Sequence, residues 1–116
     1  MRFAAPVIAA ITTLTFAYLG GPKSLGAHPF WAIRVAIFGA AIGAVVAVLL
    51  GRLPRSWLIL GFVTLLIGAM ISAYLGKAEF AASYAENAVA GRVWYFGWIL
   101  AMAGLTGLIS SLFPQR

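Results

Sequence analysis

Few side chains in this sequence could carry chemistry. Glu79, Ser83 and Glu86 form the densest polar group, and their spacing places them on one face of a helix. A pair of carboxylates can act in acid–base catalysis or bind a cation. These two carboxylates lie about two helical turns apart, with no histidine or third acid beside them. We therefore expect no catalytic residue and no metal site, and we interpret the three residues as a docking face for a partner.

His28 and Arg34 are the remaining candidates. His28 is the sole histidine and precedes Pro29 at the mouth of a predicted helix, where a capping or loop role is expected rather than haem or pigment ligation. Arg34 is the one charge inside a predicted span, and such charges often mark function. It follows Pro29 closely, so its side chain can snorkel to the membrane interface. The alternatives are an ion pair or, together with Trp31, a contact to a lipid headgroup. No cofactor is expected.

The segments that must position these residues are long and apolar. Of the 116 residues, 64% are hydrophobic and 9% are charged, against about a quarter charged in a soluble domain. Apolar residues lie all round these segments without strict alternation, which favours helices over a barrel. The fold class we expect is an all-α membrane protein in one domain, with an interfacial amphipathic helix over residues 77–91, ending near Gly91. The four predicted transmembrane helices cover residues 3–19, 29–50, 57–75 and 93–113.

The basic residues indicate a membrane rather than nucleic acid. The eight Lys and Arg residues give a net charge of +6 but lie mostly at the ends of the apolar segments, as membrane flanks do. They divide evenly between the two sides of the predicted membrane. On the side opposite the termini, however, Arg34 lies inside a helix rather than in a loop, and both acids lie on that side as well. We therefore expect both termini in the cytoplasm, and we expect the membrane to be a bacterial inner membrane. The chain has no cysteine, which excludes disulfides and thiolate chemistry.

The tetrapeptide AYLG occurs twice, at residues 17–20 and 73–76. A shift of 56 residues aligns the two copies, and this suggests a duplicated two-helix hairpin with units 1–56 and 57–116. A chance match in so apolar a chain is the alternative.

Small residues recur at four-residue spacing along the predicted helices. In lipid, such rows let helix backbones approach closely. They serve either to hold this bundle together or to contact another protein. The candidate packing or partner residues are Gly39, Gly43 and Ala47, which include a G-x-x-x-G motif, and Thr64, Gly68, Ser72 and Gly76.

Three functions fit these observations, and none is enzymatic. The first is a structural accessory subunit that packs against a larger respiratory, photosynthetic or transport complex. The second is a homo-oligomeric transporter or channel lined by Thr, Ser and Gly. The third is a lipid- or quinone-binding protein that uses Arg34 and the aromatic residues at the segment ends, which are densest over residues 94–98. Expected partners are membrane lipids and a larger complex or further copies of the chain, and not nucleic acid.

Overall fold

The computed structural model describes residues 4–25, 27, 31–83 and 88–113. All regular secondary structure in this part of the chain is helical, so the predicted helical fold class is confirmed. Three helices, α3 (Ala32–Leu49), α4 (Arg55–Ala82) and α5 (Ala88–Ser111), are long and apolar enough to cross a membrane. The first helix is apolar but only 15 residues long, so a fourth span remains a prediction. The helices are α1 (Ala4–Tyr18), α2 (Gly21–Ser24), α3 (Ala32–Leu49), α4 (Arg55–Ala82) and α5 (Ala88–Ser111).

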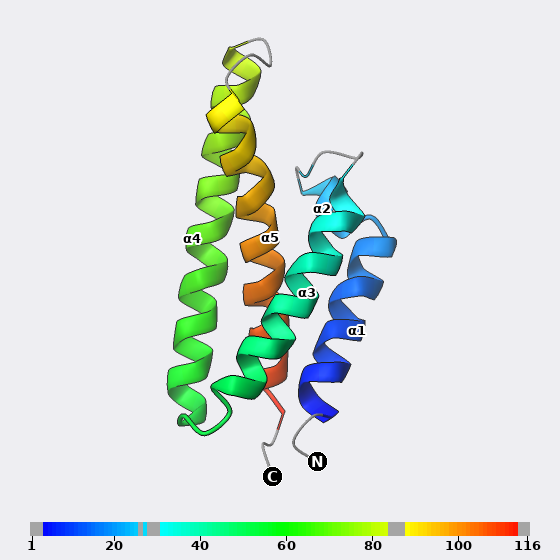
Figure 1. Cartoon of the computed structure of the whole chain (residues 1–116), viewed down its shortest axis with the longest axis vertical. Helices are drawn as coiled ribbons and strands as arrows, with labels where there is room; N and C mark the ends of the chain where they lie inside the picture. The colour runs from blue at the N-terminus through cyan, green and yellow to red at the C-terminus, as the bar shows by residue number, and fades with distance from the viewer. Residues whose placement is uncertain (1–3, 26, 28–30, 84–87, 114–116) are drawn as a thin grey trace.

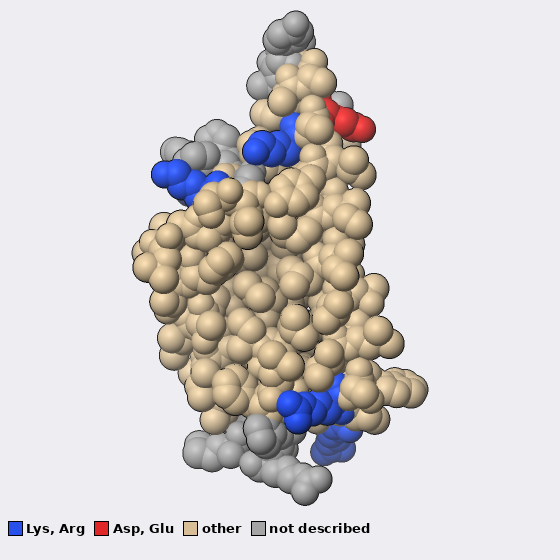
Figure 2. Space-filling model, turned by 180° about the vertical axis from the view of Figure 1, so that it is seen from behind, with Lys and Arg blue, Asp and Glu red and all other residues tan. Residues whose placement is uncertain are grey.

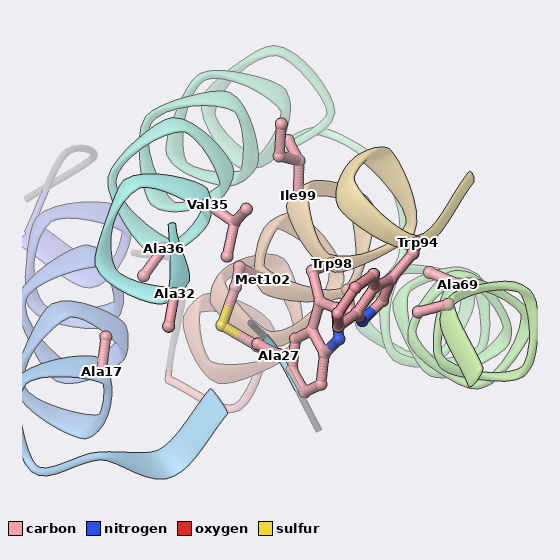
Figure 3. Packing of buried hydrophobic residues seen from close by; sticks show 12 residues of the cluster. Ala17, Ala27, Ala32, Val35, Ala36, Ala69, Trp94, Trp98, Ile99 and Met102 are labelled. Carbon is pink, nitrogen blue, oxygen red and sulfur yellow. The ribbon is translucent and has the colours of Figure 1, made fainter. Parts of the chain in front are cut away.

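Helix α5 lies at the centre of the molecule. It packs against α1, α3 and α4, and α1 also packs along α3 (Figure 1). Trp98 and Met102 of α5 lie in the core together with Val35 of α3 (Figure 3). Within the described residues, the extensive packing of α4 is with α5 alone. Most of the surface of α4 therefore faces outward, although it is the longest helix.

The long helices alternate in direction. Helix α1 begins, α3 ends, α4 begins and α5 ends at the same end of the molecule (Figure 1). Helices α3 and α5 consequently run in the same direction, antiparallel to α1 and α4. Lys and Arg side chains gather towards both ends of the face shown in Figure 2, and the band between them is uncharged. This distribution suits a molecule whose middle lies in lipid.

The prediction of a separate interfacial helix over residues 77–91 is wrong. Helix α4 continues past Leu75 to Ala82, and Gly91 lies inside α5, which begins at Ala88. The segment after Leu75 is rich in alanine and contains no proline, so nothing in it ends a helix. Gly76 lies inside α4 and allows close packing against α5, since a Cβ there would lie 2.7 Å from Trp94 N.

The two AYLG copies have different structures. Gly20 follows α1 with a φ of +88°, a left-handed conformation that glycine adopts without strain. Gly76, its counterpart, lies in the interior of α4 and is buried. The four-residue match therefore does not mark the same structural position, and the duplication remains a prediction.

Candidate functional site

The small residues of α3 lie inside the molecule. A Cβ added at Gly39 would contact Met102 Cβ and lie 2.6 Å from Ile99 O, both on α5. A Cβ at Gly43 would contact Ala103 O. Ala47 is buried on the same side of α3. The G-x-x-x-G motif thus brings the α3 and α5 backbones together.

The small residues of α4 divide between two environments. Gly76 is buried against α5, as described above. Thr64, Gly68 and Ser72 are exposed and line a groove that α4 shares with residues such as Phe96 of α5. A Cβ added at Gly68 would meet no atom within 4 Å. We call Thr64, Gly68 and Ser72 the outer α4 stripe.

Three threonine hydroxyls of the apolar helices form hydrogen bonds within the protein. Thr64 Oγ1 donates a hydrogen bond of 2.8 Å to Leu60 O, one turn earlier in α4. The Oγ1 atoms of Thr13 and Thr106 are 2.7 Å apart and buried, and this hydrogen bond joins α1 to α5. The sequence alone does not indicate that these two threonines meet. The available signal was a row of small residues at four-residue spacing in the first helix, Ala5, Ala9, Thr13 and Ala17.

Aromatic rings join three helices near the end of the molecule where α3 and α5 begin. Trp31 packs edge to face against Trp94 and Tyr95, with centroid distances of 5.1 Å in both pairs. The ring centroid of Phe80 on α4 lies 5.8 Å from that of Trp94. Lys77 Nζ is 5.9 Å from the centre of the Trp94 ring, within cation–π range. Trp31 is therefore part of an internal cluster as well as a candidate for lipid contact.

The predicted docking face can be located only in part. Glu79 is exposed near the end of α4. Ser83 follows the helix, and its hydroxyl donates a 2.8 Å hydrogen bond to Phe80 O. Glu86 and His28 lie outside the described residues. No three His, Asp or Glu side chains come together in the part of the chain that the structure describes.

Arg34 lies in the first turn of α3, because the helix begins at Ala32. Its side chain is exposed, as the predicted snorkelling requires.

In comparisons with protein-family models, curated proteins and solved structures, no match to this chain was found.

Proposed function

We propose that this protein is a small membrane subunit that packs against a larger membrane complex through the outer α4 stripe. One observation carries the proposal: Gly68 and its neighbours have the spacing of a helix-packing surface, but no helix in the described part of the chain covers them. In lipid, helices associate through close packing of such small residues rather than through a hydrophobic drive.

Other small residues of this molecule show how such positions are used where two helices meet. A Cβ at Gly43 or Gly76 would collide with the backbone of α5. A Cβ at Gly97 of α5 would lie 3.0 Å from atoms of Ala73 on α4. Small residues in this fold thus commonly mark places where two helices meet. A stripe of the same kind that faces outward is suited to a helix supplied by another protein.

The outer α4 stripe is a weaker candidate for a pore lining. Thr64 Oγ1 donates a hydrogen bond to Leu60 O, and such a bond back to the helix satisfies the side chain locally. The polar groups of a conducting pathway would instead have to face the permeating species.

The test is purification of the full chain from its own membrane in mild detergent, followed by mass spectrometry of the retained proteins. We expect a stoichiometric partner with the wild type and an approximately tenfold loss of that partner with Gly68→Leu, since forcing extra carbon atoms into a close-packed contact costs about 1–3 kcal/mol. Ala41→Leu is the matched control, because Ala41 is an exposed small residue on α3.

The outcomes separate the hypotheses. Loss of the partner from both variants, or from neither, would contradict a role for the outer α4 stripe. Retention of further copies of this chain alone would favour the homo-oligomeric hypothesis, and flux in liposomes would then be measured. A monomer without any partner would overturn the proposal.

A further inference from the structure

A groove on the outer surface between α3 and α5 combines a basic mouth with an apolar floor. Its apolar part is lined by Phe38 and Ile42 of α3 and by aromatic and aliphatic residues of α5, among them Tyr95 and Phe96. Towards the beginning of both helices it adjoins an aromatic pocket that includes Arg92 and again Tyr95 and Phe96. The two hollows therefore share a wall, and together they mark the path that a ligand would follow along α3 and α5.

Matching rows of residues flank this path. On α3, Arg34, Phe38 and Ile42 follow one another at four-residue spacing, so they share a helix face. On α5, Arg92 and Phe96 have the same spacing. Because α3 and α5 run in the same direction (Figure 1), both arginines lie at the same end of the groove and the apolar side chains continue towards its middle.

The charges at the mouth are available to a ligand. Arg34 and Arg92 are both exposed, and neither is paired with a carboxylate in the part of the chain that the structure describes. Lys77 adds a third positive charge near the aromatic pocket, where it lies over Trp94. An anionic headgroup that reaches both guanidinium groups would receive charge-assisted hydrogen bonds with bidentate geometry.

We propose that this groove binds one anionic phospholipid, with its phosphate at Arg34 and Arg92 and an acyl chain along Phe38 and Ile42. The aromatic wall matches the interfacial level of a membrane, where Trp and Tyr prefer to lie. Basic pockets between transmembrane helices bind anionic headgroups by this chemistry. The proposal does not depend on a partner at the outer α4 stripe, although Phe96 lines both grooves.

The test is native mass spectrometry of the full-length protein in mild detergent. Phosphatidylglycerol and phosphatidylcholine with identical acyl chains are supplied together, so that the two lipids differ only in the headgroup. We expect selective retention of phosphatidylglycerol by the wild type. Arg34→Gln and Arg92→Gln should each reduce the selectivity about fivefold, since a basic residue near an anionic surface contributes about 1 kcal/mol.

Two controls make the experiment decisive. Arg52→Gln removes an exposed arginine at the opposite end of the molecule and should leave the selectivity unchanged. Ile42→Trp fills the apolar part and should reduce retention of both lipids while both arginines remain. Equal retention of the two lipids by the wild type, or equal effects of Arg34→Gln and Arg52→Gln, would overturn the proposal. Displacement of the lipid by excess inorganic phosphate alone would show a phosphate site instead and would also overturn it.

Discussion

Replacing Gly39 by alanine adds one methyl group to the contact between α3 and α5. That methyl group would meet Met102 Cβ and the backbone oxygen of Ile99, and a backbone atom cannot move aside as a flexible side chain can. We expect the free energy of unfolding to fall by about 1–3 kcal/mol, the usual cost of overpacking. The fall should be visible as a lower midpoint of thermal unfolding in detergent.

Gly68→Ala is the matched control for this prediction. The same methyl group at Gly68 meets open space, and alanine stabilises a helix interior by about 0.5–1 kcal/mol relative to glycine. The two substitutions should therefore shift the midpoint in opposite directions. Equal shifts would contradict the close packing of Gly39 against α5.

These two glycines also show the limit of inference from spacing. Gly39 and Gly68 both lie in rows of small residues at four-residue spacing, and the sequence identifies both rows as packing surfaces. Spacing defines a helix face but not what covers that face, which depends on the arrangement of the other helices. Only the structure separates the buried row of α3 from the exposed stripe of α4.

At the scale of helices, the apolar runs predict the places and order of α1, α3, α4 and α5 along the chain but not the end of α4. The predicted boundary at Leu75 follows the loss of hydrophobicity, whereas the helix continues to Ala82. Polarity marks where lipid ends, and a helix can continue into water when its residues favour helix and a neighbour supports it. Phe80 provides such support, because its ring packs over Gly91 of α5.

Phe80→Ala should loosen this extension of the α4–α5 pair without unfolding the molecule. The substitution removes the ring that contacts Gly91 and Trp94, while the contacts of Gly76 with α5 remain. We expect faster amide hydrogen exchange over residues 77–82, with little change over residues 57–70. Local openings of this kind have lower free energies than global unfolding.

Val89→Ala serves as the comparison for Phe80→Ala. Val89 lies in the first turn of α5 and is 66% exposed, so its truncation should leave exchange over residues 77–82 near the wild-type rate. Equal acceleration in both variants would mean that the Phe80 ring does not hold the end of α4.

For the whole molecule, the two proposed repeat units are not equivalent in their packing. Helix α1 contacts both α3 and α5, whereas its counterpart α4 packs extensively with α5 alone within the described residues. A sequence match carries no information on this difference, because it arises from how the two hairpins meet. The central position of α5 could not be predicted from hydrophobicity, since all the long helices are strongly apolar.

The path of the chain across the membrane depends on α1. With 15 residues it is about 22 Å long, shorter than a hydrocarbon core of about 30 Å. However, α1 lies alongside α3 and begins at the end of the molecule where α3 finishes (Figure 1). Because α3 is long enough to cross, we expect α1 to cross beside it, with local thinning of the bilayer or residues outside the helix making up the difference.

Single cysteines test this topology directly, because the chain contains none of its own. Ala4→Cys, Ser24→Cys and Ser56→Cys place a thiol at exposed positions at the beginning of α1, after it and at the beginning of α4. With a membrane-impermeant maleimide on intact cells, we expect only Ser24→Cys to react, and the other two to react after the membrane is opened. Reaction of Ala4→Cys together with Ser24→Cys would mean that α1 does not cross. Reaction of Ala4→Cys and Ser56→Cys in intact cells would reverse the orientation but keep four spans.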